Sequence, residues 1–177
     1  GKLFWRDVQQ IGVFGLPEPG QAPGPDEVLD RFAAAGYRGV DLGPVGFFGT
    51  GSVLDERLER VGFGLAGGWI DLPFQDDAAF ARSLDGYRRT LAVLRDAYRP
   101  SGAPAPRPTL ACSATPDRAA RPGGGPEVRL DPDSWNRLVK NLDTAARIAR
   151  AEGLTPTFHH HACTYVETVD EIAELLE

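Results

Sequence analysis

The hydrophobic positions of this chain alternate between short apolar runs and longer segments with helical spacing. The short runs predict strands at 11–16, 39–43, 63–70, 109–114 and 155–161. Strands separated by helices are typical of βα units around a parallel sheet. The pattern therefore predicts an α/β protein with five βα units.

The helical segments carry signals for their ends. Helices are expected from Pro25 to Gly36, over 52–61, over 76–98, from Asp131 to Gly153, and over 168–177. Asp131 is placed to cap the fourth helix, and Pro132 fits its first position. Thr168 and Glu171 have the spacing of a capping box at the start of the fifth. Between strand and helix, the stretch 115–128 holds three consecutive glycines and predicts a mobile loop over a strand end.

Composition narrows the class of protein. The 177 residues are 42% hydrophobic and 25% charged, which fits one globular domain over residues 1–177. A net charge of −6 without basic stripes argues against a nucleic-acid partner. No long apolar window and no signal peptide occur, so we expect no membrane association and a cytoplasmic location. Cys112 and Cys163 are too few for a disulfide framework and are expected to be buried thiols.

All three histidines stand side by side at the end of the fifth predicted strand. In parallel α/β folds, ligands bind at the carboxyl ends of the strands. Alternation along a strand would put His159 and His161 on one face and His160 on the other. Two imidazoles on one face could bind a divalent metal or move protons on a substrate. The alternative is a hydrogen-bonded strand end with one histidine in the core.

Two other strand ends carry candidate side chains. Asp41 follows the second strand and could hold a substrate hydroxyl, or equally bond the backbone of its own loop. Trp69 follows paired glycines and offers a flat wall for a sugar, or ordinary packing. Neither a phosphate-binding glycine loop nor a nucleophile elbow is present, so nucleotide binding and serine catalysis have no support.

Chain length leaves two architectures open from the residues alone. A closed (β/α)8 barrel takes about 250 residues, whereas a five-stranded doubly wound sheet fits the length as it stands.

Three stretches resemble one known family. "GVDLGPVGFF", "GLAGGWIDLPF" and "FHHHACTYVETVDEIAELLE" are similar to the sugar phosphate isomerase/epimerase superfamily, which has a xylose isomerase-like TIM barrel. Within it the likeness is closest to the inosose dehydratase branch. The resemblance implies an α/β fold of the (β/α)8 TIM-barrel class, of which this chain holds the first five βα units and is incomplete at its C-terminus.

The resemblance also implies a site. Members of the superfamily bind a divalent ion, often manganese, cobalt or magnesium, through residues at the ends of strands five to eight. The strand-five position falls on His159, so His159 is the implied metal ligand, and the other three positions are not found here. His161 falls where the family has a substrate-facing histidine. Cys163 replaces a common glycine, so we expect the backbone there to differ in shape.

These observations predict a metal-assisted isomerase, epimerase or dehydratase. Its substrate would be a sugar, sugar phosphate or inositol-derived ketone, from which a proton is removed next to a carbonyl. His161 and His159 are the expected catalytic residues, and Asp41, Trp69 and His161 are expected to bind the substrate.

Three alternatives bear on this expectation. An apurinic endonuclease on the same barrel would need histidines on many strands and a basic face, and neither occurs. An incomplete barrel could instead be a non-catalytic sugar-binding or accessory protein. Unpaired edges on the first and last strands would make the chain a homo-oligomer or unstable.

Overall fold

The computed structural model describes residues 23–124 and 126–177. The strand expected at 11–16 lies outside these residues. The described strands are β1 (Gly39–Asp41), β2 (Gly64–Leu72), β3 (Arg107–Cys112) and β4 (Thr157–Phe158). They form one parallel sheet in the order β1-β2-β3-β4. The predicted α/β class with a parallel sheet is confirmed.

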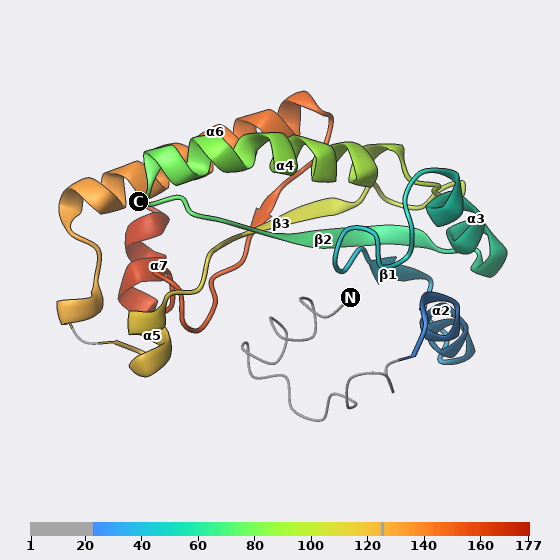
Figure 1. Ribbon diagram of the computed structural model, residues 1–177, viewed down its shortest axis with the longest axis horizontal. Helices are drawn as coiled ribbons and strands as arrows, with labels where there is room; N and C mark the ends of the chain where they lie inside the picture. The colour runs from blue at the N-terminus through green and yellow to red at the C-terminus, as the bar shows by residue number, and fades with distance from the viewer. Residues whose placement is uncertain (1–22, 125) are drawn as a thin grey trace.

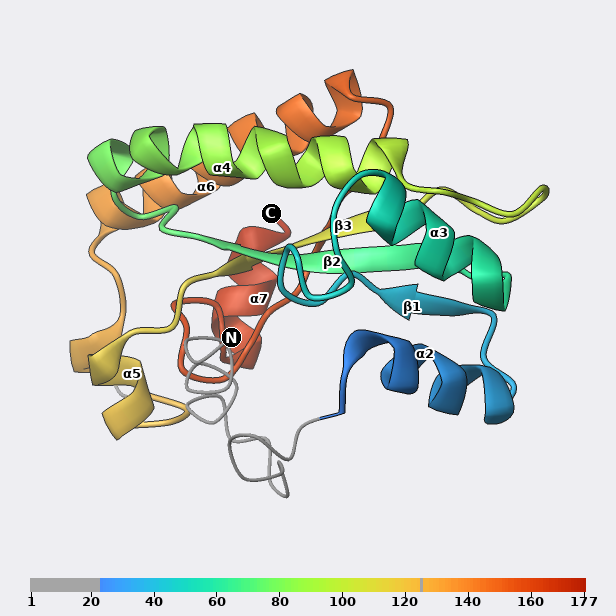
Figure 2. The same ribbon diagram turned by 45° about the vertical axis from the view of Figure 1, so that its right-hand side comes forward.

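The order of the strands decides between the two architectures. Each strand lies beside its neighbour in sequence, and the order never reverses. A doubly wound sheet reverses at a switch point, whereas a TIM barrel adds strands in sequence order. Figures 1 and 2 show the two long helices α4 (Asp77–Asp96) and α6 (Pro132–Ala151) side by side over the same face of the sheet. The fold is therefore part of a barrel.

The remaining helices agree with most of the predicted ends. They are α2 (Pro25–Ala34), α3 (Ser52–Val61), α5 (Pro116–Ala120), α7 (Val169–Leu175) and the 3-10 turn η1 (Pro126–Val128). Asp131 caps α6 by accepting a hydrogen bond from the Ser134 N–H at 2.9 Å. Thr168 and Glu171 form the capping box at the start of α7. Both predicted caps are confirmed.

The segment 115–128 is partly helical, so it is not a continuous loop as expected, and its mobility stays a prediction. This segment contains α5 and η1, and Thr115 caps α5 by accepting a hydrogen bond from the Arg118 N–H. Arg118 is fully buried. Gly124 lets the chain close over it, because a Cβ at Gly124 would lie 2.8 Å from Arg118 Nη1. Gly124 therefore allows close packing at this point.

The predicted strand over 155–161 is also too long. Only Thr157 and Phe158 pair with β3, since Pro156 has no N–H to donate. The His159 N–H donates the last bond, to the Leu110 carbonyl at 2.8 Å. The His161 N–H turns instead to the Val166 carbonyl at 3.1 Å. The histidines therefore begin a turn and do not continue the strand.

Helices α4 and α6 cover one face of the sheet, and we call the opposite face, which these two helices do not cover, the open face. A Cβ at Gly68 would lie 3.3 Å from Leu94 of α4, so the face with Gly68, Ile70 and Leu72 packs against the helices. Trp69 and Asp71 alternate with these residues and are exposed on the opposite face. Over the described residues, none of the helices has both the length and the apolar character that crossing a bilayer requires.

The close approach of β2 to β3 gives a test of the sheet. A Cβ at Gly67 would lie 2.4 Å from the Arg107 carbonyl oxygen, which belongs to the backbone and cannot move aside. We expect Gly67→Ala to lower the free energy of unfolding by about 1–3 kcal/mol in urea denaturation. Gly86→Ala is the control, because Gly86 lies inside α4 with nothing closer than 3.8 Å and alanine favours helix by about 1 kcal/mol. Equal stabilities of the two variants would contradict this packing.

Candidate functional site

The register of the sheet places the predicted site residues on its open face. Residues paired across parallel strands point to the same side. Asp41 pairs with Gly67, which lies two positions before Trp69 on β2. Asp71 pairs with Ala111 of β3, and the next residue in the register on β4 is His159. Asp41, Trp69 and His159 therefore share the face that the long helices leave open.

Trp69 is the centre of an aromatic cluster on this face. Its ring lies edge-on to His159, with centroids 5.2 Å apart, and to His161, with centroids 5.4 Å apart. The indole is 39% exposed, so it is not ordinary core packing. The His160 ring stacks on that of His159, with centroids 5.8 Å apart, so the expectation that His160 lies on the opposite face from His159 is wrong. Three imidazoles and one indole thus gather at the end of β4.

A tight turn over 161–166 fixes this arrangement. The Thr164 hydroxyl is buried and donates a hydrogen bond to the His161 carbonyl at 2.8 Å. Cys163 has a φ of 67°, a left-handed conformation that glycine adopts without strain. Cys163 thus has a conformation that glycine would favour. The expectation that the backbone here differs in shape from that of the family stays a prediction.

Hydrogen bonding sets the protonation of the His161 ring. Its Nδ1 lies 2.8 Å from the Ala162 carbonyl oxygen. Since a carbonyl oxygen only accepts, Nδ1 must carry the hydrogen. In the neutral ring, Nε2 then has the free lone pair and is the atom available to a proton or a metal.

The electrostatics of the cluster favour an uncharged His159. Partial burial of its ring, and then the charges that His161 and His160 would carry, lower the pKa of His159 below its ordinary value. A neutral imidazole can accept a proton or a metal ion, which an imidazolium cannot.

Two carboxylates lie on the same face. Asp41 accepts a hydrogen bond from the Gly43 N–H at 2.9 Å, so it does bond its own loop, and its role in substrate binding stays a prediction. Asp71 is exposed and was missed from the sequence, although its position two residues after Trp69 already implied the shared face. Two strand spacings of about 4.8 Å separate Asp71 from His159. Ala111 lies between them in the same row and is fully buried.

The described residues do not complete a metal site. Among them, no three His, Cys, Asp or Glu side chains are grouped so that they could hold an ion. His159 and His161 would supply two ligands, whereas zinc takes four and magnesium six. The role of His159 as a metal ligand stays a prediction that requires further donors.

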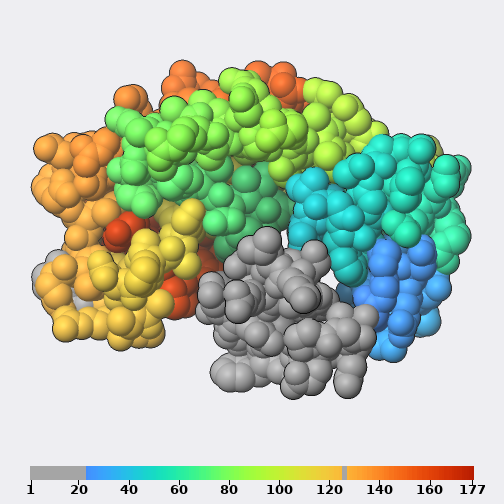
Figure 3. All heavy atoms as spheres, viewed as in Figure 1, coloured from blue at the N-terminus to red at the C-terminus, as the bar shows by residue number. Residues whose placement is uncertain are grey.

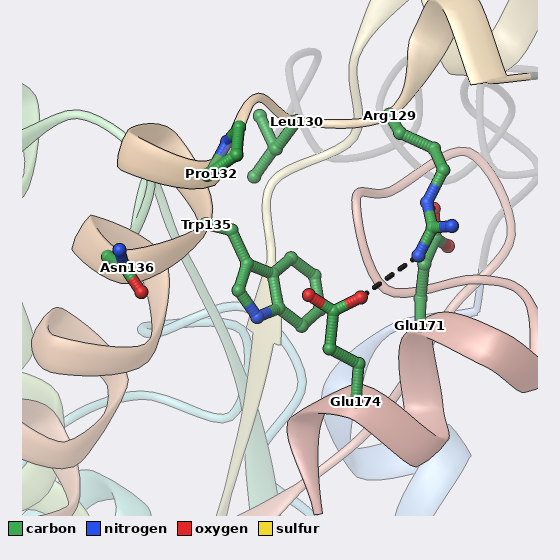
Figure 4. A pocket seen from close by; sticks show the side chains of 7 residues that line it. All are labelled: Arg129, Leu130, Pro132, Trp135, Asn136, Glu171 and Glu174. Carbon is green, nitrogen blue, oxygen red and sulfur yellow. Dashed lines mark hydrogen bonds and ion pairs between the residues drawn. The ribbon is translucent and has the colours of Figure 1, made fainter. Parts of the chain in front are cut away.

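Other polar and reactive groups lie outside the cluster. Both cysteines are free, and burial together with the charge of Glu171 raises the pKa of Cys112 to about 12, so Cys112 is a buried thiol as predicted. The same prediction is wrong for Cys163, which is only partly buried. A cavity of about 380 Å³ lies between the start of α6 and α7 (Figure 4). Trp135 forms one wall, and the ion pair of Arg129 with Glu174 crosses it at 3.0 Å. None of the predicted site residues lines this cavity.

Comparison with known proteins finds relatives that share most of this chain. It is 30% identical to an inosose dehydratase of Geobacillus kaustophilus over 156 residues, which cover 86% of this chain and 48% of that enzyme. It is 25% identical to an inosose dehydratase of Bacillus velezensis over 92% of this chain and 52% of that enzyme. The chain spans about half the length of the curated relatives it matches. No family model matches it.

Solved structures agree on the fold. A xylose isomerase-like TIM-barrel protein from Mycobacterium smegmatis in complex with magnesium matches 88% of this chain and 53% of its own, with a TM-score of 0.57 and 14% identity. An L-ribulose 3-epimerase matches 88% of this chain and 52% of its own, with a TM-score of 0.56 and 22% identity. The TIM-barrel architecture expected from the sequence is confirmed for this part of a barrel.

The left-handed residue in the histidine turn gives a second test. A left-handed conformation costs a residue with a Cβ about 1–2 kcal/mol relative to glycine. We therefore expect Cys163→Gly to unfold at a higher urea concentration than Cys163→Ala, with a difference of about 1 kcal/mol in the free energy of unfolding. Both variants lose the sulfur, so the comparison isolates the backbone. A more stable alanine variant would show that the turn has another shape.

The low pKa of His159 can be measured directly. In an NMR titration we expect His159 to protonate below the ordinary value of about 6.5 and therefore to be neutral at pH 7. His161→Gln removes one like charge and is expected to raise the pKa of His159. A pKa of His159 at or above 6.5 in the unmodified chain would contradict the cluster.

Proposed function

We propose that this chain, whose fold is similar to that of xylose isomerase-like TIM-barrel proteins, forms the histidine-bearing part of a sugar isomerase, epimerase or dehydratase. The substrate class is a keto-sugar or an inositol-derived ketone. The observation that carries the proposal is the gathering of His159 and His161 around Trp69 on the open face. The sequence likeness to inosose dehydratases supports the same class of chemistry.

His161 is proposed as the residue that moves the proton. Isomerisation, epimerisation and dehydration of such ketones all begin when a carbon next to the carbonyl loses a proton. Because Nδ1 of His161 is held by the Ala162 carbonyl, Nε2 is the atom that accepts this proton and later returns it. The pKa of an imidazole lies near neutral pH, which suits both steps.

The other residues of the face are proposed to hold the substrate. Trp69 presents a flat, half-exposed wall on which the apolar side of a sugar ring can pack. His159, kept neutral, can hydrogen-bond a ring hydroxyl or the carbonyl oxygen. Asp41 and Asp71 border the face as acceptors for further hydroxyls.

A divalent metal would polarise the carbonyl and make the adjacent proton more acidic. His159 is the residue proposed to contact it. Two histidines do not complete the coordination of such an ion, so further ligands would have to be added to them. A second candidate function is a sugar-binding protein, because the cluster of Trp69 with His159 and His161 would also suit a sugar that is bound without being converted.

A substrate panel tests the proposal. Inosose, assayed for dehydration, and L-ribulose, assayed for epimerisation, would be incubated with the protein with and without added divalent metal. We expect His161→Gln to lower kcat/KM by about 10²–10⁴-fold, as loss of a general acid–base does. His160→Gln is the comparison variant, because the His160 ring stacks on His159 whereas His159 and His161 lie against Trp69, and it is expected to change kcat/KM less than about tenfold.

Two results would count against this assignment. Equal turnover by the unmodified protein and His161→Gln would remove His161 from the mechanism. Saturable sugar binding without turnover would establish the binding protein in place of the enzyme.

A further inference from the structure

The short helix α5 and its N-cap contact four residues that follow the histidines in the sequence: Cys163, Tyr165, Glu167 and Glu171. The Thr115 N–H donates to the Cys163 carbonyl at 2.9 Å. The Arg118 guanidinium lies over the Tyr165 ring, 5.9 Å from its centroid. The same group pairs with Glu167, at 3.8 Å between Nη1 and Oε2, and with Glu171. Figure 3 shows the α5 region, in yellow, packed against the red C-terminal segment.

The Arg118 side chain is buried, and its surroundings favour a single position of the guanidinium. Its side chain is 1% exposed, and its Nε donates to the Val128 carbonyl at 3.0 Å. The glycine at 124 covers it from outside, where any side chain would collide with the guanidinium. A buried arginine that had to leave this place would lose its ion pairs and remain without compensation for its charge.

Glu171, which pairs with Arg118, is also buried and hydrogen-bonded. Glu171 is buried and also accepts the N–H groups of Glu167 and Thr168 through Oε2, both at 3.0 Å. Burial opposes ionisation of Glu171, but these N–H groups and the Arg118 guanidinium outweigh it and lower its pKa. The pair is therefore charged at neutral pH, and it ties α5 to the start of α7.

These contacts lead to His161 in two steps. Arg118 contacts Tyr165 through its ring and Glu167 through an ion pair at 3.8 Å that is too long for a hydrogen bond, and these are the residues on either side of Val166. The Val166 carbonyl accepts the His161 N–H at 3.1 Å, and Val166 is fully buried. Because the backbone of His161 is fixed through Val166, the His161 ring stays where Nδ1 meets the Ala162 carbonyl.

We propose that Arg118 is a positioning residue that braces the histidine turn and so holds His161 with Nδ1 as donor and Nε2 free. The inference rests on the proposed function for the importance of His161, but the geometry it describes exists without substrate. Arg118 touches no substrate and acts through residues 165–167.

The tautomer of His161 in the free protein is the measurement that tests this brace. At about pH 8, above the ordinary histidine pKa, ¹⁵N NMR of the imidazoles reports which ring nitrogen carries the hydrogen. In the unmodified protein we expect one dominant form of His161 with hydrogen on Nδ1. In Arg118→Met we expect His161 to become a mixture of both forms, with His160 unchanged. In Arg118→Lys, which restores the charge but not the fork of donors, we expect a partial return.

Controls separate positioning from general loss of structure. Arg95→Met removes an exposed arginine that pairs with Asp96 and Glu152, and it should leave the His161 signals as they are. If Arg118→Met does not fold, Glu167→Gln serves, because it removes one partner and leaves the Glu171 pair. A folded Arg118→Met or Glu167→Gln with an unchanged His161 tautomer would overturn the proposal. So would changes of equal size in all three histidines.

The outcome is independent of turnover. An unchanged tautomer would reject the brace and leave the proposed function standing, whereas an inactive protein with the expected tautomer shift would reject the function and leave the brace.

Discussion

The parallel register of β2, β3 and β4 is the constraint on which the site depends. Asp71 pairs with Ala111, and His159 continues the same row after β4 ends. A shift of one residue would turn Trp69 toward α4 and bring Ile70 to the open face. Gly67 contributes to this register because it lets the two backbones approach so closely. The histidines meet an indole, and not an aliphatic side chain, as a result of this pairing.

The chemistry of the face follows from what surrounds the imidazoles. Trp69 lies against both rings, and partial burial together with the charges that His161 and His160 would carry lowers the pKa of His159. A neutral imidazole is the state that can accept a proton. The Ala162 carbonyl then determines which nitrogen of His161 does so. A proton acceptor, a flat apolar wall and nearby carboxylates are the groups that a polyhydroxylated ketone would meet.

Local signals in the sequence were sufficient for much of the fold. Asp131 and Thr168 cap their helices as expected, because capping depends only on residues within one turn. The family resemblance correctly gave the barrel, which length alone did not decide. The extent of β4 was wrong because the strand ends where the turn offers the His161 N–H another acceptor. No signal in the neighbouring residues predicts this competition between two acceptors for the His161 N–H.

Arg118 and Asp71 were not identified from the sequence because their roles depend on residues far away in the chain. Arg118 looks like a surface arginine beside a glycine loop, and only its pairing with Glu171, 53 positions later, makes it buried. The alternation of side chains along β2 could have identified Asp71. Its place in the candidate site, however, depends on which face of the sheet the helices leave open. The gathering of His159 and His161 around Trp69 required the pairing of three strands, which neither composition nor periodicity provides.

The position at which a keto-sugar binds tests most directly whether the face with Trp69, His159 and His161 is the functional site. NMR spectra of the ¹⁵N-labelled protein would be recorded while inosose is added. If the sugar binds at this face, the signals of the Trp69 indole N–H and of the His159 and His161 rings shift progressively, and those of Trp135 in the cavity between α6 and α7 change little. Shifts confined to Trp135 and its neighbours, or no shifts at the histidine face at saturating sugar, would contradict this assignment of the site.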